Sequence, residues 1–162
     1  GNVQFKIISF MGVFGSIVGG ILADILLRKL GPKWGRRIPG MVAGSIAAVV
    51  YFASLFVHNV WLFVILMAFI YFLTDLGLGA LWATYQDFGG KYVSSVLGFA
   101  NMCGNLGAAL FGIVIGYLAD ADLWPVVFML SSGSFVIVAC VWFFVDPTHQ
   151  LVPDEKAVPP KL

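Results

Sequence analysis

Long apolar segments, separated by short polar stretches, make up most of the chain. Five of them, at residues 7–27, 38–57, 60–82, 93–119 and 124–145, are close to or above the ~20 residues that a helix needs to cross a bilayer core. Strands of a membrane barrel would alternate apolar and polar residues, and segments such as VWLFVILMAFIYF at 60–72 do not. The pattern predicts an all-α, polytopic membrane protein with five transmembrane helices.

Composition points to the same class. Hydrophobic residues make up 60% of the chain and charged residues 10%, against about 25% charged residues in a soluble domain. We expect residues 1–146 to form a transmembrane domain. Residues 147–162 are rich in proline and charge, and we expect them to form a disordered cytoplasmic tail.

The basic residues predict the orientation of the helices. If each apolar segment crosses the membrane once, all nine Lys and Arg residues except Lys6 fall on one side. The positive-inside rule then places the 28–37 loop, the 87–92 loop and the C-terminus in the cytoplasm. We therefore expect a multi-pass protein of the inner membrane, in contact with the lipid bilayer.

Several other classes of protein lack support in the sequence. The basic residues cluster at a membrane edge, so a nucleic-acid partner is not expected. Cys103 and Cys140 lie within apolar segments, and neither His58 nor His149 has partners at metal-ligand spacing, so we predict no metal site and no cofactor. No nucleophile and base pair is visible, and the chain is not expected to be an enzyme.

An internal repeat suggests a missing segment. Residues 17–24 read IVGGILAD and residues 113–120 read IVIGYLAD, with six of eight positions identical. The first copy would end at the cytoplasm and the second at the outer side, as in the inverted repeats of transporters. If the first two helices correspond to the last two, the middle helix lacks a counterpart, and a helix is expected before Gly1.

Four groups of residues carry a resemblance to a known family. They are Gly19-Gly20 with Asp24 and Arg28-Lys29, followed by Arg36-Arg37; Trp82-Ala83 with Asp87; Asn101 with Gly104-Asn105; and DPTHQL at 146–151. In order and spacing they resemble helices 8–12 of the C-terminal half of a major facilitator superfamily transporter, within its anion:cation symporter family, which includes bacterial sugar-acid transporters.

The resemblance implies a function and partners. It implies a fragment of a secondary active transporter that moves a small organic anion, a sugar acid or another carboxylate, by proton- or sodium-coupled alternating access. The N-terminal half of the same chain would supply the proton-carrying acidic residues and a substrate-binding Arg. The sequence leaves open a second possibility, a self-contained five-helix membrane subunit with a structural or assembly role.

Asp75 is the candidate site residue of the third predicted helix. An acidic side chain at the centre of a membrane helix costs about 2.5–3.5 kcal/mol on insertion scales, so it is expected to face a cavity or a partner. Tyr71, Asp75 and Trp82 share one helical face, which we expect to line the substrate path. Alternatively, a protonated Asp75 bonds to a neighbouring helix and only holds the helices together.

The fourth predicted helix carries Asn101 and Asn105 on one face. Amides can hydrogen-bond the hydroxyl and carboxylate groups of an organic anion without adding charge to the membrane. The resemblance places Asn101 at a substrate-contacting position, whereas helix packing is favoured for Asn105.

Charged residues at the cytoplasmic side form a candidate gate, made of Asp24, Arg28, Arg36, Arg37 and Asp87. Asp24 and Arg28 are four residues apart and so can form an ion pair on one helix face. In the family that the chain resembles, this loop helps to hold the two halves together in the outward-facing state. Purely topogenic charge is the alternative, and it is favoured for Lys29 and Lys33.

Three small-residue motifs are expected to pack helices closely. They are Gly15-x-x-x-Gly19, Gly40-x-x-x-Gly44 and Gly112-x-x-x-Gly116.

Overall fold

The computed structural model describes residues 2–149, and within this range the chain is helical without a strand. The elements are α1 (Asn2–Ser54), α2 (Val60–Gly89), a short 3₁₀ turn η1 (Gly90–Tyr92), α3 (Val93–Asp120) and α4 (Trp124–Phe144). Among the described residues, three helical spans are long and apolar enough to cross a membrane, at 3–54, 60–120 and 124–144. The all-α membrane class is confirmed, while the predicted tail lies almost wholly outside the described residues.

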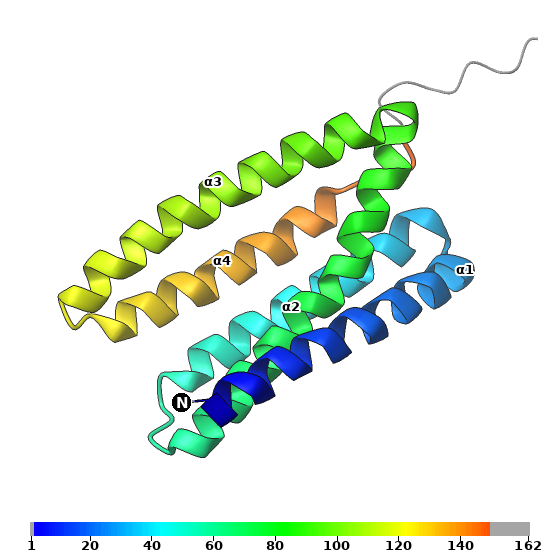
Figure 1. Cartoon of the computed structure of the whole chain (residues 1–162). Helices are drawn as coiled ribbons and strands as arrows, with labels where there is room; N and C mark the ends of the chain where they lie inside the picture. The colour runs from blue at the N-terminus through cyan, green and yellow to red at the C-terminus, as the bar shows by residue number, and fades with distance from the viewer. Residues whose placement is uncertain (1, 150–162) are drawn as a thin grey trace, which may run out of the picture.

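The prediction of five separate helices is not reproduced, because the expected loop at 28–37 is helical apart from one residue. Gly31 has φ 77° and ψ 174°, and the chain turns back at this point (Figure 1). Glycine adopts such a positive φ without steric cost. Pro32 then starts the second arm of α1, at a helix position that proline tolerates. We refer to residues 2–30 and 32–54 as the first and second arms of α1.

The remaining connections are short. Asn59 caps α2, because its side-chain oxygen accepts hydrogen bonds from the backbone N–H groups of Trp61 and Leu62 at 2.9 and 3.1 Å. Gly90, with φ 48°, allows the chain to turn from α2 through η1 into α3. These tight turns place consecutive helices beside one another.

Both arms of α1 pack through glycines. A Cβ atom added at Gly15 or Gly19 in the first arm would collide with the backbone of Phe72 or Leu76 in α2. In the second arm, Gly40 lies against the indole ring of Trp142, and Gly44 lies against Ala139 of α4. Two of the three predicted small-residue motifs therefore allow close helix approach within the chain.

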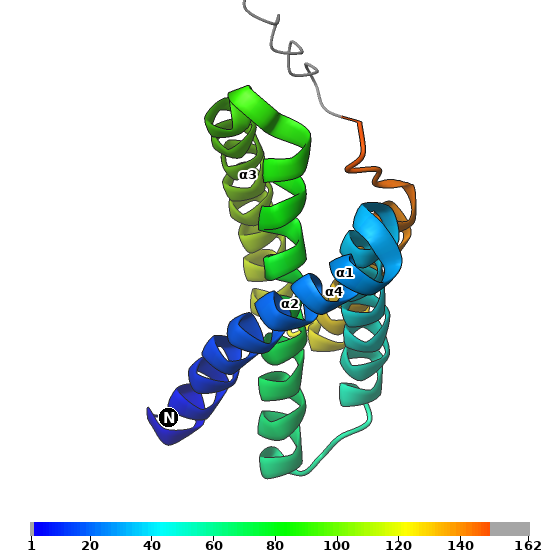
Figure 2. The same ribbon diagram turned by 90° about the vertical axis from the view of Figure 1, so that its right-hand side faces the viewer.

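α3 differs from the other helices. It lies at the edge of the bundle in both views (Figures 1 and 2) and has no buried residue. A Cβ atom added at Gly112 or Gly116 would meet nothing within 4 Å, so the third motif makes no close contact with the described residues. The packed part of the chain thus consists of α1, α2 and α4.

Candidate functional site

Arg36 joins the second arm of α1 to the end of α2. Its Nε atom lies 2.9 Å from Oδ2 of Asp87, and its side chain is buried. A hydrogen bond between two charged groups is stronger than one between neutral groups. The pair fixes the C-terminal end of α2 against the bend in α1.

Arg37 and Lys33 join the same arm to the end of α4. The Arg37 Nε–H donates to the carbonyl oxygen of Val145, and Nη2 lies 4.0 Å from Oδ2 of Asp146. The Lys33 Nζ atom lies 2.6 Å from the same carboxylate oxygen. The Arg37 guanidinium also lies 5.5 Å from the centroid of the Trp34 ring, within the range of a cation–π contact.

The electrostatics of Asp146 agree with this arrangement. Hydrogen bonding by Lys33 and then by Thr148 holds the pKa of the Asp146 carboxyl well below its usual range. Thr148 donates from both its hydroxyl and its backbone N–H to Oδ1, at 2.6 and 3.2 Å. Lys33, Arg36, Arg37, Asp87 and Asp146 together form what we call the helix-end clasp.

The clasp contains only three of the five predicted gate residues. Arg36, Arg37 and Asp87 are used within the chain, whereas Asp24 and Arg28 are exposed. The ion pair expected between Asp24 and Arg28 is not formed, and neither residue has an ion pair with any of residues 2–149. Lys33 and Asp146 were not predicted to form contacts. The sequence feature that could have predicted this contact is the acidic residue directly after the last apolar segment, on the same predicted side as the basic loop.

Asp75 lies where the first arm of α1 crosses α2. A Cβ atom added at Gly12 would lie 2.5 Å from Oδ2 of Asp75 and 2.8 Å from Cδ1 of Tyr71. One turn further along α2, Gly79 lies against the backbone of Gly19 and Gly20. Part of the face that was predicted to line a path is therefore the contact face with α1.

The Asp75 carboxyl group makes no hydrogen bond within residues 2–149, and it is only partly buried. An interhelical bond of the kind that the packing interpretation requires is therefore not formed in the described part of the chain. Gly12 was not identified from the sequence. Its signal was the spacing Gly12-x-x-Gly15-x-x-x-Gly19, which places all three glycines on one helix face.

The other predicted path residues are exposed. Tyr71 and Trp82 of α2 have exposed fractions of 52% and 46%, so less than half of the Tyr71 surface is covered by the described chain. Asn101 and Asn105 are exposed on α3, and the Asn105 amide donates to the backbone carbonyl of Asn101 at 2.8 Å. This bond stays within α3, so Asn105 does not bind another helix through it.

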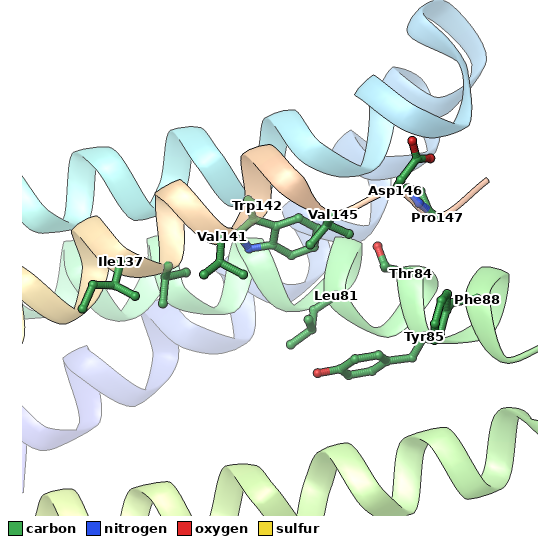
Figure 3. Close-up of a pocket in the computed structure, with 11 residues that line it drawn as sticks. Leu81, Thr84, Tyr85, Phe88, Ile137, Val141, Trp142, Val145, Asp146 and Pro147 are labelled. Atoms are coloured by element: carbon green, nitrogen blue, oxygen red, sulfur yellow. The ribbon is translucent and has the colours of Figure 1, made fainter. Parts of the chain in front are cut away.

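A mainly apolar cavity of about 570 Å³ lies between α2 and α4, beside the clasp (Figure 3). It is lined by Leu81, Thr84, Tyr85, Phe88, Ile137, Val138, Val141, Trp142, Val145, Asp146 and Pro147. The cavity does not include any of the predicted path residues.

The sequence model of the Major Facilitator Superfamily matches residues 3–161 of the chain. A "Probable sulfoacetate transporter" of Cupriavidus necator is 27% identical over 90% of this chain and 35% of its own length. "Probable galactarate/D-glucarate transporter" proteins of Pseudomonas putida and Escherichia coli K12 are 30% and 33% identical, over 90% and 76% of this chain. The matched region spans 33% and 25% of their lengths, so the chain corresponds to about a third or less of these relatives. No solved structure matches the chain.

Proposed function

Because the chain belongs to the Major Facilitator Superfamily, we propose that it is the C-terminal part of a secondary active transporter that moves a small organic anion, a sugar acid or another carboxylate. The similarity to probable galactarate/D-glucarate and sulfoacetate transporters carries this proposal. All of these named substrates are organic anions, so the substrate class follows from their shared chemistry. We propose coupling to a proton or sodium gradient, with alternating access as the mechanism.

We further propose that the chain crosses the membrane five times, through the two arms of α1 and through α2, α3 and α4. The helix-end clasp supports this topology, because it gathers the bend of α1 and the C-terminal ends of α2 and α4 at one end of the molecule. This end carries the basic residues that the positive-inside rule assigns to the cytoplasm. The C-terminus would then be cytoplasmic and the membrane would be the inner membrane.

The exposed polar side chains of α2 and α3 are proposed to face the substrate path. Asn101, Asn105, Tyr71 and Trp82 present amide, hydroxyl and indole groups that can bond to a hydroxylated carboxylate. Asn101 and Asn105 are exposed, and other parts of the described chain cover only about half of Tyr71 and Trp82, which suits a surface completed by an N-terminal half of the same protein. That half would also supply the cationic group that an anionic substrate requires.

Asp24 and Arg28 are proposed to contact that N-terminal half at the cytoplasmic gate. Both are exposed at the end of the first arm, next to the bend. Exposed ion pairs contribute only about 0–1 kcal/mol each, so a gate formed by them can open and close readily. In contrast, Arg36, Arg37 and Asp87 are proposed to keep the helices of this chain together throughout the cycle.

Uptake by the complete protein in liposomes tests this function. We expect accumulation of radiolabelled galactarate, D-glucarate or sulfoacetate when a proton or sodium gradient is imposed. Asn101→Ala is expected to raise KM about tenfold, as the loss of one good hydrogen bond to a charged group predicts. Met102→Ala is the matched control, since Met102 is exposed on the same helix but carries no donor. Failure of the protein to accumulate any organic anion would overturn the proposal.

A further inference from the structure

We propose that Asp75 takes up and releases a proton at the crossing of α1 and α2, and that Gly12 is the positioning residue that makes room for its carboxyl group. The role of this contact in transport rests on the proposed function. The protonation itself is a property of the two helices and can be tested separately from transport.

The geometry at Gly12 is specific to the Asp75 side chain. Gly15 and Gly19 of the same helix face lie against the backbone of α2, at Phe72 and Leu76. Gly12 instead lies against two side chains, the Asp75 carboxyl and the Tyr71 ring. Because a Cβ atom at position 12 would come within 2.5 Å of Oδ2 of Asp75, any larger residue must displace the carboxyl group.

Within residues 2–149, the surroundings of Asp75 provide no charge that compensates for an ionised carboxylate. Residues 7–23 of the facing arm include no ionisable side chain, and the nearest charged residues of α1 in sequence are Lys6 and Asp24. On α2 itself the neighbouring ionisable group is the Tyr71 hydroxyl. α3 lies against α2 near Tyr85 and Phe88, about three turns away from Asp75.

A proton therefore compensates for the charge. An isolated carboxylate in a membrane is costly, and binding one proton converts it to a neutral acid without the need for another partner. The neutral form can stay against the apolar face of α1, whereas the charged form needs water or a cation. Release of the proton therefore favours separation of the carboxyl group from α1, which loosens the helix crossing at Gly12. Gly15 and Gly19 still hold the two helices together at the next two turns.

Infrared spectroscopy of the complete, purified protein tests the protonation directly. A carboxylic-acid C=O band that titrates in wild type and is missing in Asp75→Asn reports this group. Gly12→Ala is expected to move the midpoint of that band at least about one pH unit downward, which is a tenfold change in proton affinity. The added methyl group displaces the carboxyl group from the apolar face of α1, where only its neutral form can stay, and this favours the charged form.

Gly20→Ala is the matched control for Gly12→Ala. It makes the same substitution in the same arm, at a position where a Cβ atom meets nothing within 4 Å. We expect the midpoint in Gly20→Ala to equal that of wild type. An unchanged or higher midpoint in Gly12→Ala, an equal shift in Gly20→Ala, or the absence of a titrating Asp75 band would each overturn the proposal.

The pH profile of uptake by the same proteins in liposomes tests the role in transport. The profile of Gly12→Ala is expected to shift in parallel with the infrared midpoint, and that of Asp75→Asn to lose the corresponding step. If the infrared midpoint shifts but no protein transports an organic anion, only the proposed function fails. If wild type transports and its profile does not follow the infrared midpoint, only the coupling role of Asp75 fails.

Discussion

The two copies of the internal repeat have nearly the same sequence but different surroundings. In the first copy, at 17–24, Gly19 lies against the backbone of Leu76, and Ala23 is 2% exposed. In the second copy, at 113–120, Ile115 stands at the position of Gly19, the corresponding Ala119 is not buried, and the whole of α3 has no buried residue.

This difference shows that a small-residue motif permits close helix packing but does not determine whether another helix packs there. Glycines four residues apart create a flat strip on a helix, along which another backbone can approach closely. Whether a backbone does approach depends on the partner helix, which α2 supplies for the first copy. We propose that the second copy is covered by the remainder of the transporter.

Gly19→Ala is expected to have the largest effect on stability. The methyl group collides with the backbone of Leu76, which cannot move as a side chain can, so the free energy of unfolding should fall by about 3 kcal/mol, at the upper end for overpacking. Thermal or denaturant unfolding of the complete protein in detergent measures this loss.

Gly116→Ala is the matched control, because Gly116 ends the Gly112-x-x-x-Gly116 motif as Gly19 ends Gly15-x-x-x-Gly19, and a Cβ atom at Gly116 meets nothing within 4 Å. If only the described residues surrounded it, the effect would be within about 0.5 kcal/mol. Equal and large losses for both variants would show that both copies are packed to the same degree in the complete protein. The difference in packing between the copies would then hold only for the described residues taken by themselves.

Much of the fold follows from the sequence because apolar segment length and charge position are strong physical constraints in a membrane. All-helical structure and the packing role of Gly15 and Gly40 were predicted in this way. The bend at Gly31 was not predicted, since a single residue with positive φ replaces the loop expected at the charged segment. The number of helices predicted from hydrophobic segments therefore differs from the number given by the backbone geometry.

The candidate site was less predictable, because sequence spacing describes one helix at a time. Spacing placed Asp24 and Arg28 within reach of each other, but the ion pairs that form join separate helices, such as Arg36 with Asp87. Spacing also placed Asp75 on a helix face without indicating that Gly12 lies opposite. Contacts between helices depend on crossing geometry, which no local pattern specifies.

Arg36→Gln is expected to have the second-largest effect on the free energy of unfolding. It tests whether the helix-end clasp holds the packed part of the chain together. Removal of one partner from a buried ion pair costs about 3–5 kcal/mol. Since the Asp87 side chain is 36% exposed, we expect a smaller loss, about 2 kcal/mol. Arg28→Gln is the control, as Arg28 is exposed near the same bend and has no ion pair in the described chain. Equal unfolding energies for the two variants in denaturant titrations would contradict the clasp.

The clasp should also give a small pH dependence of stability through Asp146. Its pKa is lowered in the folded state, so its contribution is present above the unfolded pKa of about 4 and is lost as the pH falls further. The melting temperature of wild type is therefore expected to exceed that of Asp146→Asn at neutral pH, with the difference shrinking below pH ~4. In Lys33→Gln, which lacks the main cause of the lowered pKa, this pH dependence should be largely absent. A difference between wild type and Asp146→Asn that stays constant down to pH ~2 would contradict this assignment.

The acidic residues that end the two copies give the smallest expected change in stability and the sharpest test of function. Asp24 and Asp120 are both exposed, and neither has an ion pair within residues 2–149. Asp24→Asn and Asp120→Asn are therefore each expected to change the free energy of unfolding by less than about 0.5 kcal/mol. Their effects on uptake should differ, because only Asp24 lies at the proposed cytoplasmic gate. We expect Asp24→Asn to change the uptake rate several-fold and Asp120→Asn to leave it unaltered. Equal uptake by both variants would contradict a role of Asp24 in the gate. The exposed carboxylate at the end of each copy would then only place charge at the membrane edge.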